Sequence, residues 1–134
     1  MKRILIVDDS PTIRRMVRAS LAGVGADQFV EANTGLEGIE QLTLAAPSLM
    51  VLDLNMPDMH GLDVLKFLRA QPAFRSLPVI VLTTRGDESS RTAALQAGAT
   101  VYMTKPFVPA ELSAQVRTLL QDQPASRESH HVEP

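Results

Sequence analysis

Four short apolar runs, separated by segments long enough to form helices, constrain the fold of this chain more than any other feature. They lie at 4–7 (ILIV), 49–52 (LMVL), 79–82 (VIVL) and 101–103 (VYM). The first three are continuously apolar and do not alternate with polar residues, which is typical of parallel strands covered by helices on both faces. The more polar segment 28–32 fits an edge strand of the same sheet.

The segments between these runs carry apolar residues at spacings of three and four, the period of a helix with one buried face. The apolar positions are Ile13, Met16, Val17, Leu21 and Val24, then Leu36, Ile39 and Leu42, then Leu62, Leu65 and Leu68, and near the end Leu112, Val116 and Leu119. An alanine-rich helix is expected over 88–97.

Strands are expected at 3–7, 28–32, 49–53, 78–82 and 100–103. Each is followed by one of the helical segments, so strand and helix alternate five times along the chain. This alternation predicts an α/β fold, a doubly wound, five-stranded parallel sheet with five helices and right-handed crossovers.

Local signals mark several ends of these helices. Ser10 is suited to cap the first helix and Pro11 to begin it, because proline lacks only an N–H that has no helical partner there. Gly98 is expected to end the helix over 88–97, and Pro109 to begin the last helix. Gly61 is expected to give the loop after the third strand its freedom to turn.

Length and composition restrict the class of protein. The chain is long enough for one domain, which we place at 1–121, and the polar stretch 122–134 is expected to be a disordered tail. A net charge of -2 over 134 residues does not favour binding to nucleic acid or to a membrane surface. No apolar stretch approaches the roughly 20 residues needed to cross a bilayer. The chain contains no cysteine, which excludes disulfides and thiolate metal sites, and a cytoplasmic protein is expected.

Polar residues stand at the ends of four of the expected strands. They are Asp8 and Asp9, Asp53, Thr83, and Lys105. In open parallel sheets the carboxyl ends of the strands form the ligand site, so we expect these side chains to meet. Two carboxylates about 5 Å apart repel by roughly 3 kcal/mol at an effective dielectric constant near 20, so the cluster requires positive partners. Lys105 is one, and a hard cation, Mg²⁺ or alternatively Mn²⁺, is the other that oxygen ligands favour.

These residue types suggest a distinct task for each side chain. Asp53 would be the nucleophile that accepts a phosphoryl group, while Lys105 and Thr83 would contact the oxygens of that group. The expected metal ligands are the carboxylates of Asp9 and Asp53, a water held by Asp8, and the backbone carbonyl of Asn55. Taken alone, Asp8 and Asp9 could instead be favourable charges at a helix N-terminus. Their occurrence together with the other strand-end residues favours the binding site.

Four segments together resemble the signature of bacterial response-regulator receiver domains: 6–10 (IVDDS), 53–61 (DLNMPDMHG), 82–83 (LT) and 105–107 (KPF). The resemblance covers about residues 2–120 and includes the order and spacing of the motifs. It implies a flavodoxin-like sheet with strand order 2-1-3-4-5 and a cis peptide bond between Lys105 and Pro106. It also implies Mg²⁺-dependent transfer of a phosphoryl group to Asp53 from a sensor histidine kinase or a phosphotransfer protein. Such a protein is a signalling switch that catalyses only its own phosphotransfer and dephosphorylation.

Phosphorylation of Asp53 is also expected to change the conformation of neighbouring residues and so to transmit a signal. It adds a charge of about -1.5 to -2, which is expected to draw the side chains of Thr83 and Lys105 toward Asp53. In similar proteins an aromatic residue of the fifth strand then turns inward, and Tyr102 stands at that position. The resemblance implies that a downstream protein docks on the face formed by the fourth helix, the fifth strand and the fifth helix. A monomer is expected, with phosphorylation-induced dimerisation as an alternative.

Other functions stay open at this point. The length favours a chemotaxis-type regulator, with a phosphate shuttle in a multistep relay as the alternative. An Mg²⁺-dependent phosphatase is the main enzymatic alternative, but haloacid-dehalogenase-like phosphatases carry Asp-x-Asp on the first strand, and here Asp8 and Asp9 are adjacent. A flavodoxin-like electron carrier would need a longer phosphate loop than residues 10–12 offer. Arg85 either tunes access to the site or is a solvated loop residue, and for His60 a role in metal binding or phosphorelay is the less favoured interpretation.

Overall fold

The computed structural model of the chain describes residues 1–121. Its strands are β1 (Arg3–Val7), β2 (Gln28–Ala32), β3 (Leu49–Leu52), β4 (Val79–Thr83) and β5 (Val101–Thr104). Its helices are α1 (Pro11–Ser20), α2 (Gly35–Ala45), α3 (Gly61–Ala70), α4 (Glu88–Ala97) and α5 (Pro109–Gln121), with a short 3-10 helix, η1 (Pro72–Phe74). The tail expected to be disordered, 122–134, lies outside the described residues.

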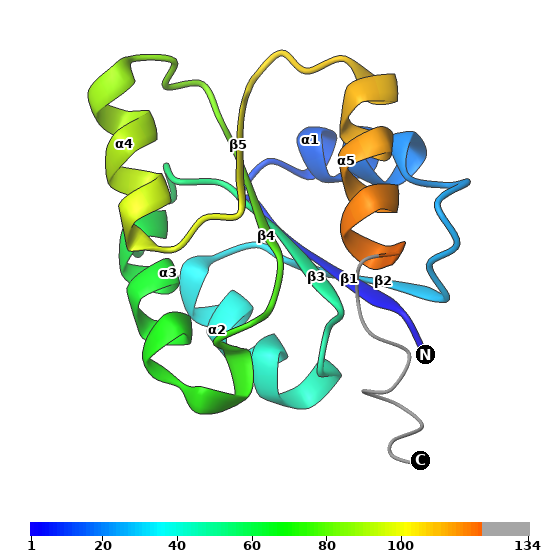
Figure 1. The fold of residues 1–134 in the computed structure, drawn as a ribbon, viewed down its shortest axis with the longest axis horizontal. Coiled ribbons are helices and arrows are strands. Elements are labelled where there is room, and N and C mark those ends of the chain that lie inside the picture. Colours follow the sequence, from blue (N-terminus) through cyan, green and yellow to red (C-terminus); the bar gives the residue numbers. More distant parts are fainter. Residues whose placement is uncertain (122–134) are drawn as a thin grey trace.

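The strands form one parallel sheet in the order β2-β1-β3-β4-β5, which confirms the predicted fold (Figure 1). β1 pairs with β2 on one side, where Ile4 lies opposite Phe29, and with β3 on the other, where Ile4 lies opposite Leu49. The polar strand β2 is at an edge, as its composition predicts. The order of the strands reverses at β1 and β3, and this is the place where open sheets of this kind bind ligands.

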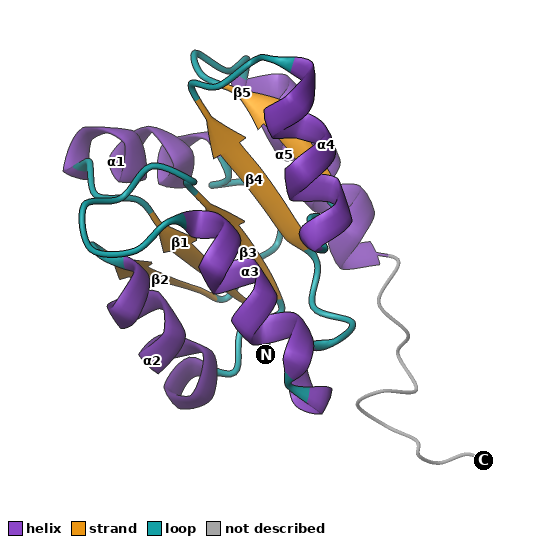
Figure 2. Cartoon of the chain, turned by 90° about the vertical axis from the view of Figure 1, so that its left-hand side faces the viewer, coloured by secondary structure: helices purple, strands orange, loops and turns teal. Residues whose placement is uncertain are grey.

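Helices cover both faces of the sheet (Figures 1 and 2). α1 and α5 pack side by side on one face, and α2, α3 and α4 cover the other. Successive residues of β1 belong to the two different cores, Ile4 and Ile6 to the α1–α5 side and Leu5 and Val7 to the α2–α4 side. All four side chains are fully buried. Burial on both faces explains why the strand is continuously apolar.

Three of the predicted strands have boundaries that differ from the structure by one residue. β3 ends at Leu52, one residue earlier than predicted, while β4 and β5 each begin and end one residue later. Pro78 has no N–H for the sheet ladder, although its carbonyl accepts a hydrogen bond from Met50 at 3.0 Å. The shift makes Thr83 the last residue of β4 and Asp53 the first residue after β3.

The predicted inward face of α1 is wrong at Met16. The residue Met16 is 46% exposed, whereas its neighbour Val17 is fully buried. An α-helix turns by about 100° per residue, so the side chain of Met16 leaves α1 about 100° away from that of Val17 and lies toward solvent. The helix also ends at Ser20, so Val24 lies beyond it, where it still packs against the core.

The predicted inward face of α2 is wrong at Leu36, which is 60% exposed. The buried line of α2 consists of Gly35, Gly38 and Leu42. A Cβ atom at Gly38 would lie 3.0 Å from the Val7 side chain. Glycine therefore lets α2 lie close to β1, and Leu36 points away from the core.

The predicted helix ends are confirmed. The Ser10 side chain accepts a hydrogen bond from the backbone N–H of Ile13 at 3.2 Å, and Pro11 is the first residue of α1. Gly98 caps α4 in the left-handed conformation, with φ 116°. Pro109 begins α5. None of the helices within 1–121 is long and apolar enough to cross a membrane.

Gly61 is required for close packing and not for a turn, so its predicted role is wrong. Its φ lies outside the left-handed region. A Cβ atom at Gly61 would lie 2.6 Å from the carbonyl oxygen of Asp53 and 2.7 Å from the Cα of Leu54. Glycine thus allows α3 to begin in contact with the backbone that carries Asp53.

We expect Gly61→Ala to lower the free energy of unfolding by about 1–3 kcal/mol, because the added methyl group must displace backbone. Gly86→Ala is the matched control, since its Cβ would meet Thr104 at an ordinary 3.6 Å. Urea denaturation of both variants and the wild type measures the difference. Equal losses in the two variants would contradict this explanation of Gly61.

Candidate functional site

The carboxyl edge of the sheet brings the predicted site residues together. Asp8 and Asp9 follow β1, Asp53 follows β3, Thr83 ends β4, and Lys105 follows β5. Parallel pairing places all of these strand ends on the same side of the sheet (Figure 2). The strand pattern alone therefore locates the site.

Three carboxylates form the floor of this site. One oxygen from each of Asp8, Asp9 and Asp53 lies within 4.8 Å of the others. Asp8 and Asp53 are only 3% and 4% exposed, whereas Asp9 is exposed to solvent. Two of the three charges are therefore removed from water and need partners within the protein.

Lys105 provides the positive partner that the sequence predicts. Its Nζ lies 2.7 Å from Oδ2 of Asp8 and 3.6 Å from Oδ1 of Asp53. The Lys105 side chain is only 11% exposed, so water screens these pairs weakly. The peptide bond between Lys105 and Pro106 is cis, as the resemblance implies.

The electrostatic environment of Asp53 is unfavourable to its own charge. Burial raises the pKa of the Asp53 carboxyl, and the nearby charge of Asp8 raises it further, against an opposing effect of Lys105. A raised pKa means that the ionised form is less stable here than in water, and added positive charge would stabilise it. A divalent cation at the three carboxylates would supply that charge.

The donor set fits Mg²⁺. Its atoms are carboxylate oxygens, which Mg²⁺ and Mn²⁺ prefer, and they come from two loops that meet at one edge. Mg²⁺ keeps several water ligands, so it needs few ligands from the protein. The role predicted for the backbone carbonyl of Asn55 stays a prediction.

The Asn55 side chain adds a contact that the sequence analysis missed. Its Nδ2 donates to Oγ1 of Thr83 at 3.4 Å, and its backbone N–H donates to Oδ1 of Asp53 at 3.3 Å. Asn55 thus bridges the carboxylate and the hydroxyl predicted to act together. Its position two residues after Asp53 was the available signal, but sequence cannot show where an amide points.

Thr83 is connected to Tyr102 through one residue of the β4–α4 loop. The backbone N–H of Arg85 donates to Oγ1 of Thr83 at 3.3 Å. The Tyr102 hydroxyl in turn donates to the backbone carbonyl of Arg85. The Arg85 side chain forms an exposed ion pair with Asp87, 3.4 Å away.

His60 has a structural task at the start of α3. Its Nδ1 accepts a hydrogen bond from the backbone N–H of Leu62 at 3.1 Å, which caps the helix. It lines a hollow of about 240 Å³ together with Asn55 and Arg85. This helix-capping hydrogen bond accounts for a histidine at position 60 without any role in metal binding.

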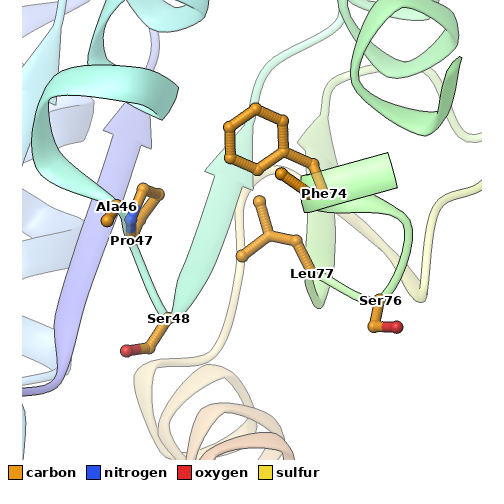
Figure 3. Close-up of a pocket in the computed structure, with 7 residues that line it drawn as sticks. Ala46, Pro47, Ser48, Phe74, Ser76 and Leu77 are labelled. Atoms are coloured by element: carbon orange, nitrogen blue, oxygen red, sulfur yellow. The ribbon is translucent and has the colours of Figure 1, made fainter. Parts of the chain in front are cut away.

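A separate hollow of about 410 Å³ lies at the opposite edge of the sheet (Figure 3). It is enclosed between Ala46–Ser48, before and at the start of β3, and the segment from Phe74 to Leu77. No carboxylate or cationic side chain lines it within the described residues. The residues that line this hollow thus differ from the charged residues of the carboxyl edge.

Comparison with known proteins agrees with this geometry. The family described as the response regulator receiver domain matches residues 4–117. The chain belongs to this family. Chemotaxis protein CheY1 of Helicobacter pylori J99 is 38% identical over 119 residues, which cover 88% of this chain and 96% of CheY1. The KDP operon transcriptional regulatory protein KdpE of Escherichia coli is 42% identical over 120 residues, 90% of this chain but only 52% of KdpE.

Solved structures show the same fold. The chemotaxis response regulator CheY4 of Vibrio cholerae has a TM-score of 0.81 at 31% identity, covering 89% of this chain and 98% of CheY4. The receiver domain of a signal transduction histidine kinase from Syntrophus aciditrophicus has a TM-score of 0.84 at 34% identity, covering 93% and 94% of the two chains. The predicted family and fold are therefore both confirmed.

The raised pKa of Asp53 predicts a gain in stability when its charge is removed. The folded protein binds a proton at Asp53 more tightly than the unfolded chain does, so ionised Asp53 opposes folding above the ordinary pKa of aspartate. We expect Asp53→Asn to raise the free energy of unfolding at neutral pH by an amount on the order of 1 kcal/mol without divalent cations. The gain should disappear at acidic pH, where the carboxyl is protonated in both states.

Asp58→Asn makes the same chemical change with the opposite expected sign. The backbone N–H groups of Gly35 and Leu36 donate to the Asp58 carboxylate and lower its pKa. Ionised Asp58 therefore favours folding, and we expect its replacement to reduce stability at neutral pH. Urea denaturation in the presence of EDTA over a range of pH measures both variants. A loss of stability in Asp53→Asn would contradict the electrostatic account.

Proposed function

We propose that the chain is a phosphorylation-controlled signalling switch that accepts a phosphoryl group on Asp53. One observation carries the proposal: the buried carboxylate of Asp53 has an oxygen within 4.8 Å of two further carboxylates and lies 3.6 Å from the ammonium group of Lys105. This arrangement can bind a divalent cation and a phosphoryl group side by side. Membership of the receiver family supports it. The proposed donors are a sensor histidine kinase or a phosphotransfer protein.

The proposed transfer exchanges one bond at phosphorus for another. A carboxylate oxygen of Asp53 attacks the phosphorus atom, and the bond between phosphorus and the donor nitrogen or oxygen breaks, which gives an acyl phosphate. Mg²⁺, when bound, offsets the negative charge that Asp53 and the phosphoryl oxygens bring together. The ligands we propose for it are Asp9, Asp53, the backbone carbonyl of Asn55, and a water held by Asp8.

Lys105 and Thr83 would bind the transferred group. The Lys105 ammonium already lies between Asp8 and Asp53, so it can pair with a phosphoryl oxygen with little movement. Thr83 is fully buried and ends the neighbouring strand, from which its hydroxyl can donate to a second oxygen. The chain would thus catalyse its own phosphorylation and dephosphorylation without acting on a free substrate.

The proposed output begins at Thr83. A hydroxyl that turns toward the phosphoryl group alters its hydrogen bonds with Asn55 and with the backbone of Arg85. Because the Tyr102 hydroxyl is bonded to Arg85, that change reaches β5 through a single residue. Tyr102 is half-buried and can change its packing.

The surface beside Tyr102 is the proposed docking face for a downstream protein. A hollow of about 310 Å³ lies there between α4, β5 and α5, and Arg91, Tyr102, Phe107, Val108 and Glu111 are among its lining residues. Val108 is 52% exposed, so the face offers apolar area next to charged groups. These features suit a protein surface that changes when Tyr102 moves.

The phosphoacceptor proposal is tested by intact-protein mass spectrometry after incubation with acetyl phosphate. We expect one phosphoryl adduct on the wild type in the presence of Mg²⁺, and none after chelation or in Asp53→Asn. Asp58→Asn is the matched control, because it removes a nearby carboxylate outside the proposed site and should still be labelled. An adduct that persists in Asp53→Asn would place the acceptor elsewhere and contradict the proposal.

The coupling of Thr83 to Tyr102 has a direct spectroscopic reporter. Tyr102 is the single tyrosine of the chain, which contains no tryptophan, so tyrosine fluorescence reports on this residue alone. We expect beryllofluoride with Mg²⁺, which mimics a phosphoryl group, to change the fluorescence of the wild type. Thr83→Ala should reduce the change, and Asp53→Asn should abolish it. A full response in Thr83→Ala would contradict the proposed route.

A further inference from the structure

A half-buried arginine contacts the backbone of the acidic loop that follows β1. Arg14 lies in α1, and its side chain is only 13% exposed. Its Nη1 donates to the backbone carbonyl oxygen of Asp8 and to Oδ1 of Asn33, the latter at 2.9 Å. Its Nε donates to Oε1 of Glu31 at 2.8 Å. One guanidinium therefore joins the β1–α1 loop to the end of β2 and the residue that follows it.

The carbonyl that Arg14 binds belongs to the peptide group between Asp8 and Asp9. The orientation of this peptide group determines where the Cα atoms of Asp8 and Asp9 lie, and the two carboxylate side chains extend from these atoms. Two further hydrogen bonds hold the same loop, from the backbone N–H of Asp8 to the carbonyl of Ala32 at 3.2 Å and from Ser10 to the Asp8 carboxylate at 2.9 Å. Among these contacts, the one from Arg14 comes from a charged side chain whose guanidinium group is planar and rigid.

Arg18 provides an internal comparison one helical turn further along α1. It also pairs with Glu31, with Nη1 2.8 Å from Oε2, and it lies 5.6 Å from the centre of the Phe29 ring. Its side chain is 51% exposed. The hydrogen bonds from Arg18 and then Arg14 lower the pKa of Glu31, so both arginines meet an ionised partner at neutral pH. The two residues share Glu31, but the contact with the Asp8 carbonyl is made by Arg14.

We infer that Arg14 is a positioning residue for the divalent cation, because it holds the Asp8–Asp9 peptide in the orientation that lets both carboxylates face the ion. The inference rests on the proposed function. Mg²⁺ requires nearly ideal octahedral geometry at about 2.0–2.1 Å from its ligands, so a small rotation of this peptide weakens binding. Residues that orient metal ligands typically contribute about 10–100-fold to metal affinity.

A role through charge and a role through positioning predict opposite effects on Mg²⁺ affinity when Arg14 is removed. A positive charge near the site repels a cation, so a residue that acted only through its charge would weaken Mg²⁺ binding, and its removal would strengthen it. A residue that positions the ligands strengthens binding, and its removal weakens it. The sign of the change therefore separates the two roles.

The experiment measures Mg²⁺ affinity by isothermal titration calorimetry on the full chain. Arg14→Lys keeps the charge and loses the planar, three-partner contact, and we expect about tenfold weaker binding. Arg18→Lys is the matched control and should stay within about twofold of the wild type, since Arg18 makes its contacts away from the acidic loop. Arg14→Ala removes the charge as well and should still bind more weakly than the wild type.

A second measurement excludes a general loss of structure. At saturating Mg²⁺, the labelling of Arg14→Lys by acetyl phosphate should return to nearly the wild-type rate, because the defect lies in affinity. Wild-type affinity in Arg14→Lys, or tighter binding in Arg14→Ala, would overturn the inference while leaving Asp53 as the acceptor. Absence of Mg²⁺ binding by the wild type would instead overturn the metal site of the proposed function, and the inference with it.

Discussion

Mutual repulsion of three carboxylates at the carboxyl edge of the sheet is the interaction on which the rest of the structure depends. Lys105 lies within 4.0 Å of two of them, and Asp9 faces solvent. Burial and then the charge of Asp8 raise the pKa of Asp53, against the opposing effect of Lys105. Ionisable groups with a perturbed pKa that gather at one point are typical of functional sites, and this is the physical reason to look for chemistry there.

Different hydrogen bonds and ion pairs hold the two sides of the carboxyl edge, the side of β1 and β2 and the side of β4. On the side of β1 and β2, Arg14 joins the acidic loop to Glu31 and Asn33. The loop after β3 is joined to the start of α2 by the bonds from Gly35 and Leu36 to Asp58, both 3.0 Å. On the side of β4, hydrogen bonds of 3.3 and 3.4 Å connect Thr83 to its neighbours. The proposed displacement of Thr83 would be passed to β5 through Arg85, whose carbonyl accepts the hydrogen bond from Tyr102.

The sequence allowed the fold and most of the candidate site to be predicted, because both depend on strand ends. Asp8 and Asp53 each follow a continuously apolar run, Lys105 follows the end of the last strand, and parallel pairing leaves one edge where such ends can meet. Met16 and Leu36 were misplaced because apolar spacing does not say which neighbour faces the sheet, and at α2 two glycines occupy that face. The contacts of Arg14 and of the Asn55 amide depend on side-chain directions across separate elements, on which spacing carries no information.

The central claim is that Asp53 and a divalent cation form one phosphoryl-binding unit at this edge. The most direct measurement is a crystal structure of the chain with Mg²⁺ and beryllofluoride. The account predicts beryllium bonded to a carboxylate oxygen of Asp53, contacts from Lys105 and Thr83 to the fluorine atoms, and Mg²⁺ bound by Asp9 and Asp53. Beryllofluoride bound at another carboxylate, or Mg²⁺ bound away from these acids, would contradict it.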